Sequence, residues 1–154
     1  MALGDGIRRN IASVDPSERD LLRDAFIEMN KRFFPGTRTN SPSGGVSWWF
    51  KQDEIHQATH VHGGAEFLPW HRVICNRIEE MLRQIDPRLS LHYWNFNEDP
   101  APLFTTPTDD PVHYFMGSGS GSAGNPWLNA GYYVPGAVNY RSEDPFDADR
   151  KSVV

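Results

Sequence analysis

The sequence is poor in cysteine and contains no long apolar run. Of its 154 residues only Cys75 is a cysteine, which excludes an intramolecular disulfide and a zinc site built from several thiolates. No stretch approaches the roughly 18 consecutive apolar residues of a transmembrane helix, and the first residues lack the basic and apolar regions of a signal peptide. We therefore expect a cytoplasmic protein that does not bind membranes, with any metal held by histidine and carboxylate side chains.

Positive charge is also scarce. The chain has 15 Lys and Arg residues against 20 Asp and Glu residues, a net charge of −5, so it lacks the positive field that holds a phosphate backbone. We expect no nucleic-acid partner. Hydrophobic residues make up 38% of the chain, which is too many for a disordered protein, and this length suffices for one buried core. The sequence predicts a single globular domain over residues 1–154.

Caps, prolines and apolar spacing predict three helices in the first 87 residues. Asp15 is suited to cap the first helix, and Ser47 to cap the second. The two glycines at 63–64 stop the second helix, and the Asp-Pro pair at 86–87 stops the third. The predicted helices run from Pro16 to Pro35, from Trp48 to near Val61, and from Pro69 to residues 86–87.

The chain beyond residue 87 loses the helical pattern. Residues 89–96 are rich in aromatic side chains and are predicted to be extended. Repeated prolines and the Gly-Ser tract at 117–122 then predict an irregular region with a mobile loop, in which Trp127, Tyr132 and Tyr133 are expected as buried anchors. The predicted fold is therefore mainly α, helical over about residues 14–87 and irregular and aromatic-rich over about residues 88–154.

Histidine is concentrated in one short window. Four of the six histidines fall between residues 56 and 71, namely His56, His60, His62 and His71. His56 and His60 are four residues apart and share a helical face. His62 lies at the end of that helix and His71 in the first turn of the next, so two antiparallel helices joined by a short loop would aim three imidazoles at one point. Imidazole binds copper, zinc, iron and nickel, so the spacing predicts a metal site without fixing the metal.

Other polar side chains have simpler explanations. His92 and His113 stand among aromatic residues in proline-bounded segments, where a structural role is expected. Cys75 is expected to be a small core residue. Glu66 is expected to be an exposed loop residue rather than a proton acceptor.

The segment around His62 and His71 carries a longer motif. Residues 62–72 read His-Gly-Gly-Ala-Glu-Phe-Leu-Pro-Trp-His-Arg. This strongly resembles the copper-A signature of the tyrosinase, catechol oxidase and hemocyanin family of type 3 copper proteins, in which a histidine stands nine residues before that of Phe-Leu-Pro-Trp-His-Arg. The resemblance extends back to residues 53–56 and forward through Glu79 to residues 86–94, after which Asn95 replaces the family's usual acid.

The resemblance implies copper ions as the cofactor and a three-histidine ligand set. His62 and His71 correspond to the second and third copper-A ligands. His56 corresponds to the first, with His60 as its rival, and is favoured because it lies on one helical stripe with Gln52. The implied fold is the copper-binding helix pair of a type 3 four-helix bundle.

The family's second ligand set has no counterpart in the sequence. Each of the family's two copper ions is held by three histidines, and after His71 only His92 and His113 remain. The chain thus resembles the copper-A half alone. Three explanations stay open: a homodimer that rebuilds a dicopper site across a twofold axis, a mononuclear protein or one that needs a partner chain for copper B, and a degenerate product without redox activity.

The resemblance implies a copper oxidoreductase, a monooxygenase or catechol oxidase that oxidises phenols or o-diphenols with O2. We expect a second chain to complete the dicopper site. The alternative is a mononuclear copper- or oxygen-binding module without phenol oxidase turnover. A three-histidine zinc hydrolase is disfavoured, because Gln57 follows His56 where zinc proteases carry the glutamate that acts as general base.

Overall fold

The computed structural model describes residues 3–34, 46–59 and 62–117 of the chain. Its main elements are three α-helices, α1 (Pro16–Lys31), α2 (Trp48–Thr59) and α3 (Phe67–Ile85). The shorter elements are a two-stranded sheet and two 3-10 turns: β1 (Phe33–Phe34), β2 (Val46–Ser47), η1 (Ile11–Ser13) and η2 (Ala101–Leu103). The prediction of a mainly α fold is confirmed.

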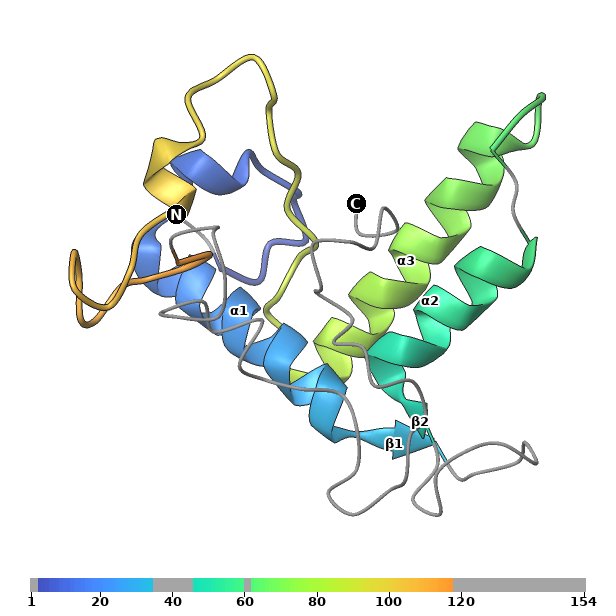
Figure 1. Ribbon diagram of the computed structural model, residues 1–154, viewed down its shortest axis with the longest axis horizontal. Coiled ribbons are helices and arrows are strands. Elements are labelled where there is room, and N and C mark those ends of the chain that lie inside the picture. The colour runs from blue at the N-terminus through green and yellow to red at the C-terminus, as the bar shows by residue number, and fades with distance from the viewer. Residues whose placement is uncertain (1–2, 35–45, 60–61, 118–154) are drawn as a thin grey trace.

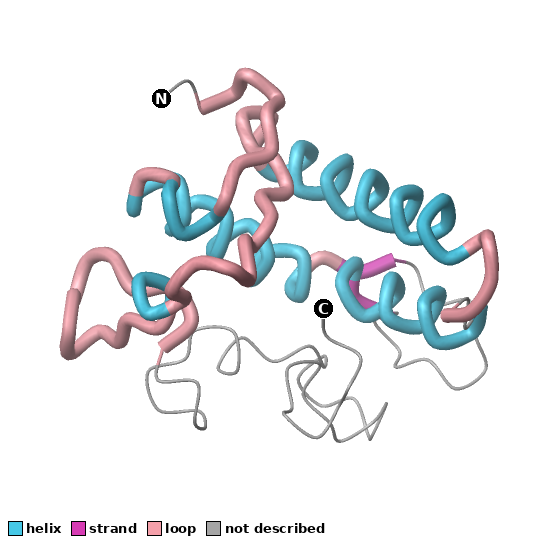
Figure 2. The backbone as a smooth tube through the Cα atoms, turned by 90° about the horizontal axis from the view of Figure 1, so that it is seen from above, coloured by secondary structure: helices cyan, strands magenta, loops and turns pink. Residues whose placement is uncertain are grey.

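α2 and α3 lie side by side and antiparallel, and a short loop joins them at one end, as Figure 1 and Figure 2 show. α1 runs beneath the other end of this pair and contacts both helices (Figure 1). The antiparallel sheet at the end of α1 leads the chain into α2. The loop end of the helix pair, which carries the histidine-rich segment, therefore lies away from α1.

α1 begins where predicted and ends earlier. The Asp15 side chain accepts a hydrogen bond from the Ser17 N–H at 2.9 Å, as expected of an N-cap. The helix ends at Lys31, short of the predicted Pro35. β1 follows almost at once and pairs with β2, so the backbone must become extended there. The end of α1 is set by the pairing of β1 with a segment more distant in sequence, so it could not be predicted from apolar spacing within the helix.

The ends of α2 and α3 follow local chemistry. The Ser47 hydroxyl accepts a hydrogen bond from a backbone N–H of the first turn at 3.0 Å, which confirms the predicted cap of α2. α2 ends at Thr59, and its predicted end near Val61 lies outside the described residues. α3 begins at Phe67, two residues before the predicted Pro69, because a proline in the first turn has no intrahelical N–H bond to lose. α3 ends before the Asp-Pro pair at 86–87, as predicted.

The core forms where α1 meets α3 and the segments that flank them. Met29 and Leu82 are fully buried at its centre. Phe26 and Trp49 add a T-shaped contact between α1 and α2, with 5.2 Å between the ring centroids. Fully burying one Leu, Met or Phe side chain is worth about 1.5–3 kcal/mol, so this core fixes the base of the α2–α3 pair. The core cluster comprises Ile11, Val14, Leu22, Ala25, Phe26, Met29, Met81, Leu82, Leu89, Leu103 and Phe115.

The described segment after α3 forms a β-bridge at one point. Tyr93 forms an isolated bridge to the N-terminal segment, donating a backbone hydrogen bond to Arg9 at 2.9 Å and accepting one from Ile11 at 2.8 Å. The Glu98 N–H then donates to the Asn95 carbonyl, which turns the chain and ends the pairing. The prediction of an extended run over 89–96 is therefore confirmed by pairing at Tyr93 and is wrong at Phe96, which lies in the turn.

The irregular region continues to residue 117 apart from η2, as predicted. Trp127, Tyr132, Tyr133 and the Gly-Ser tract beyond residue 117 lie outside the described residues. Within the part of the chain that the structure describes, no helix is long and apolar enough to cross a membrane.

Candidate metal centre

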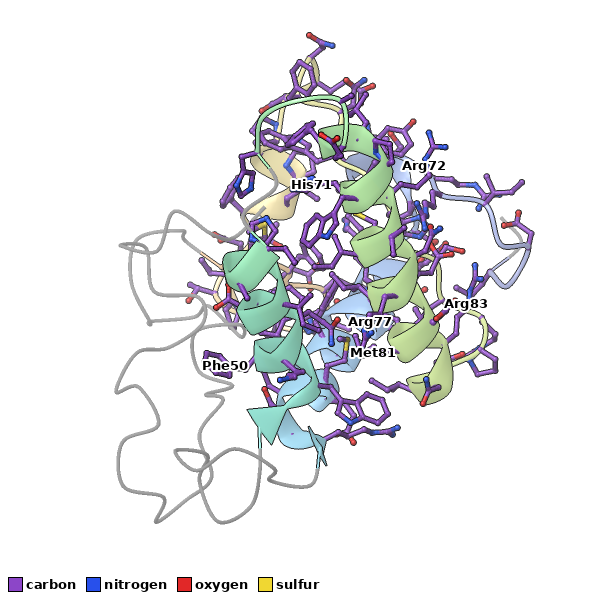
Figure 3. All side chains as sticks on the ribbon, turned by 90° about the vertical axis from the view of Figure 1, so that its right-hand side faces the viewer. Phe50, His71, Arg72, Arg77, Met81 and Arg83 are labelled. Atoms are coloured by element: carbon purple, nitrogen blue, oxygen red, sulfur yellow. The ribbon has the colours of Figure 1, made fainter. Side chains whose placement is uncertain are left out.

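Three histidines meet at the loop end of the α2–α3 pair. His56 comes from the last turn of α2, His62 from the connecting loop and His71 from the second turn of α3. One ring nitrogen of each lies within 4.8 Å of the other two. In Figure 3 His71 lies between the ends of the two helices. The structure thus brings together the three histidines that the sequence resemblance predicts as copper-A ligands.

The rival for the first ligand position, His60, lies outside the described residues. The ring of His56 approaches both other histidines, with centroids 4.8 Å from His62 and 5.4 Å from His71. Among the described residues, His56 is therefore the α2 histidine that approaches both His62 and His71.

Hydrogen bonds determine which nitrogens are available to a metal. His71 Nδ1 lies 2.8 Å from the Phe67 carbonyl oxygen, which only accepts, so Nδ1 carries the proton and Nε2 keeps its lone pair. The Nε2 atoms of His56 and His62 lie 3.1 Å apart. Two nitrogens bound at about 2.0–2.1 Å to one tetrahedral ion are about 3.3 Å apart. His56 and His62 therefore fit one metal ion, and the third ring nitrogen, which lies within 4.8 Å of the other two, would move closer to join them.

Two aromatic rings flank the histidines. Phe67 lies 4.3 Å from His71 and 6.3 Å from His62, measured between ring centroids. Trp70 lies 4.8 Å from His71 and 5.5 Å from His56. His62 is exposed and the other two histidines are half-buried, so the centre opens to solvent on the side of His62.

The remaining described histidines have structural partners, which confirms their predicted role. His92 accepts a hydrogen bond from the Arg9 N–H at Nδ1 and donates one from Nε2 to Glu18. His113 is hydrogen-bonded to Asp20, and this bond raises the pKa of the His113 imidazole above its usual 6.5. These partners tie His92 to the N-terminal segment and α1, and His113 to α1.

Glu79 has a role that the sequence did not reveal. Its buried carboxylate accepts hydrogen bonds from Arg8 at 2.6 Å, Arg83 at 2.8 Å and the Leu91 N–H at 2.9 Å. Burial by itself would raise the pKa of Glu79, but the hydrogen bonds and the positive charges of the two arginines lower it below its usual value. The available signal was an acid eight residues after His71, and two of its three partners, Arg8 and Leu91, lie outside α3.

The two single-residue expectations for Glu66 and Cys75 have different outcomes. Glu66 is exposed, as expected, and lies directly before α3. Cys75 is only half-buried, so its prediction as a core residue is wrong, because the core cluster reaches only the C-terminal half of α3. Asn95 donates to Glu98 at 2.7 Å, so its amide stabilises the turn after the bridge.

Comparison with known proteins identifies the family. Residues 38–147 match the family model of the common central domain of tyrosinase, and the chain belongs to this family of type 3 copper proteins. Copper is the cofactor of the family, and imidazole is a ligand that copper accepts. The resemblance carried by residues 62–72 is thereby confirmed.

The similar proteins include both tyrosinases and hemocyanins. A putative tyrosinase-like protein of Caenorhabditis elegans is 27% identical over 125 residues, which are 80% of this chain and 16% of that protein. Hemocyanin β-C chain unit G of Helix pomatia is 27% identical over 116 residues, 72% of this chain and 28% of the hemocyanin sequence. The tyrosinase of Streptomyces antibioticus is 27% identical over 92 residues, 60% of this chain and 28% of the tyrosinase. The chain thus spans less than a third of these relatives, and no solved structure matches it.

Proposed function

We propose that this chain is the copper-A half of a phenol-oxidising enzyme like tyrosinase or catechol oxidase, with His56, His62 and His71 as the ligands of one copper ion. The observation that carries the proposal is the convergence of these imidazoles from α2, the loop and α3 to within 4.8 Å. The substrates are phenols or o-diphenols together with O2. Bound copper would supply one-electron redox chemistry at the solvent-facing end of the helix pair.

The reaction balances with an o-diphenol as reductant and O2 as oxidant. Two o-diphenol molecules each lose two electrons and two protons to become o-quinones, and one O2 gains four electrons and four protons to become two water molecules. The chain contributes by orienting its ligands: the Phe67 carbonyl holds the proton on His71 Nδ1 and leaves Nε2 for the metal. The exposure of His62 leaves the site accessible to a small phenol.

A second chain is proposed to complete the dicopper site. Among the described residues one group of three histidines could hold a metal, and His92 and His113 are bound to Glu18 and Asp20 instead. Two copies related by a twofold axis would place two such groups face to face, and isologous dimers are the commonest oligomers. A separate partner chain that carries the second ligand set is the other form of the same proposal.

The test is copper content together with molecular mass and catechol oxidation on the full chain. We expect two copper ions per dimer, and a specific activity that falls when dilution produces monomers. His71→Ala should lose both copper and activity. One copper per chain in a monomer that does not oxidise catechol would overturn completion by a second copy, and activity restored by adding a copper-B chain would identify the partner form.

A second candidate function is a mononuclear copper- or oxygen-binding module. It is favoured by the similarity to hemocyanins as well as tyrosinases, and by the one three-histidine group among the described residues. Full copper loading without turnover of any phenol, in dimer and monomer alike, would support this module against the enzyme.

A further inference from the structure

The two aromatic residues beside the metal centre contact the histidines in a regular way. Phe67 contacts His71 and His62, with centroid distances of 4.3 and 6.3 Å. Trp70 contacts His71 and His56, at 4.8 and 5.5 Å. In these contacts each aromatic ring pairs the α3 histidine with one histidine from outside α3.

The local geometry of α3 produces this arrangement. Phe67 lies four residues before His71, so the two side chains are neighbours on one helical face. Trp70 is adjacent to His71 in sequence and reaches His56 on α2. Figure 3 shows that Arg72, the next residue, points away from α2. Beside His71 itself, Phe67 and Trp70 thus link this part of α3 to the loop and to α2.

We infer that Phe67 and Trp70 form an aromatic clamp that positions the three histidines before a metal binds. Trp70 couples the α2 ligand to the α3 ligand, and Phe67 couples the loop ligand to the α3 ligand. A ligand side chain that is already held in place loses less conformational freedom on metal binding, so the clamp raises metal affinity. Both are positioning residues, and the inference rests on the proposed role of His56, His62 and His71 as metal ligands.

The ring and the backbone of Phe67 act separately. The carbonyl of residue 67 accepts the His71 Nδ1 proton whatever the side chain is. Phe67→Leu therefore removes the ring contacts with His71 and His62 and keeps the tautomer of His71. This variant therefore separates the effect of the ring contacts from the effect of the hydrogen bond between His71 Nδ1 and the carbonyl of residue 67.

The experiment measures the dissociation constants of Cu²⁺ and of Zn²⁺, each alone, by chelator competition on the full chain. Residues that orient metal ligands typically change metal affinity by about 10- to 100-fold, so Trp70→Leu and Phe67→Leu should each weaken binding by about this factor. Trp70→Phe keeps a ring and should recover most of the affinity. Trp49→Leu is the matched control, because Trp49 packs on Phe26 of α1 at 5.2 Å, and it should lower the melting temperature with little change in affinity.

A second measurement on the metal-free protein reports the ring contacts on which the clamp depends. Ring currents of Phe67 and Trp70 should shift the imidazole proton resonances of His71. Phe67→Leu should therefore move the resonances of His71 and His62, and Trp70→Leu those of His71 and His56.

Each outcome separates the clamp from the proposed function. Affinities within twofold of the unmodified chain in both Leu variants would overturn the clamp, as would an equal loss in Trp49→Leu. If the unmodified chain binds metal no better than His71→Ala, the proposed ligand role fails, and the metal-free spectra alone then decide the clamp: unchanged imidazole resonances in both variants would overturn it.

Discussion

His71 and His92 are both held by hydrogen bonds, but in ways that leave them different chemistry. His71 donates from Nδ1 to the carbonyl of Phe67 in its own helix and keeps Nε2 for a metal. His92 is bonded at both ring nitrogens, to the Arg9 N–H and to Glu18. A ring with both nitrogens occupied inside the packing stabilises the fold and has no lone pair to offer.

The first prediction compares these two histidines. His71→Ala should abolish copper binding, whereas His92→Ala should keep the copper content per chain. Loss of His92 leaves the buried Glu18 without its hydrogen bond, which should lower the free energy of unfolding by about 1–3 kcal/mol. Atomic absorption and urea denaturation provide the measurements. An equal loss of copper in both variants would show that the ligands are misassigned.

The second prediction concerns the Glu79 carboxylate. Glu79→Ala leaves Arg8, Arg83 and the Leu91 N–H without their acceptor. Hydrogen bonds to a charged group contribute about 1.5–3 kcal/mol, and since both arginines are about one-third exposed, the loss should lie near the lower value. Glu80→Ala, at the exposed neighbouring position, is the control and should stay within about 0.5 kcal/mol. Equal losses in urea denaturation would contradict this role.

Because the pKa of Glu79 is lowered, its contribution to the free energy of unfolding depends on pH. Its contribution is present above the unfolded carboxyl pKa of about 4.3 and is lost as the pH falls through the lowered folded pKa. The difference in stability between the unmodified chain and Glu79→Ala should therefore shrink in acid.

At the scale of elements, α1 holds the irregular segment 105–117 through side-chain contacts. Arg23 donates to the Tyr114 carbonyl, and its guanidinium lies 4.6 Å from the centre of the Tyr114 ring. Asp20, one turn earlier on α1, bonds to His113. The segment has no helix or strand of its own, so these charged contacts and the buried Phe115 fix its position.

The third prediction follows from the raised pKa of His113. The Asp20–His113 pair contributes fully below the unfolded histidine pKa of about 6.5, and this contribution is lost as the pH rises through the raised folded pKa. The unmodified chain should therefore exceed His113→Asn in stability by more at about pH 5.5 than at about pH 9. Chemical denaturation at both pH values measures the difference. A difference that is constant or grows with pH would refute the pairing.

At the scale of the whole molecule, the metal centre lies at the end of the helix pair that the core does not reach. The core cluster includes Met81 and Leu82 from the C-terminal half of α3, whereas His71 lies in the N-terminal half. α2 and α3 are joined at the histidine end by a short loop, so a metal bound to both helices and the loop would tie this end together. Metal binding and folding stability should therefore be coupled.

The fourth prediction measures that coupling. At a free copper concentration about 100 times its dissociation constant, the free energy of unfolding should rise by about 2.7 kcal/mol. The melting temperature should increase on loading and return when a chelator is added. His71→Ala should show no increase, and an equal increase in that variant would place the stabilising metal elsewhere.

Much of the helical frame could be predicted because its signals are local. The caps Asp15 and Ser47 act within a few residues of each helix start, so the sequence reports them directly. The early end of α1 could not be predicted in this way, because β1 is set by its pairing with β2, more than ten residues later in the chain. The half-exposure of Cys75 depends on how far along α3 the core extends, which also has no local signal.

For the candidate site, the sequence by itself determined the ligand types and their spacing, because a motif from residue 62 to 72 places two histidines on a loop and the helix that follows. Only the tertiary structure showed that the predicted His56 comes within 4.8 Å of them, that Glu79 binds Arg8, and that Trp70 links α3 to α2. These are contacts between separate segments. Their geometry depends on how the helices pack, and no periodicity along one segment encodes it.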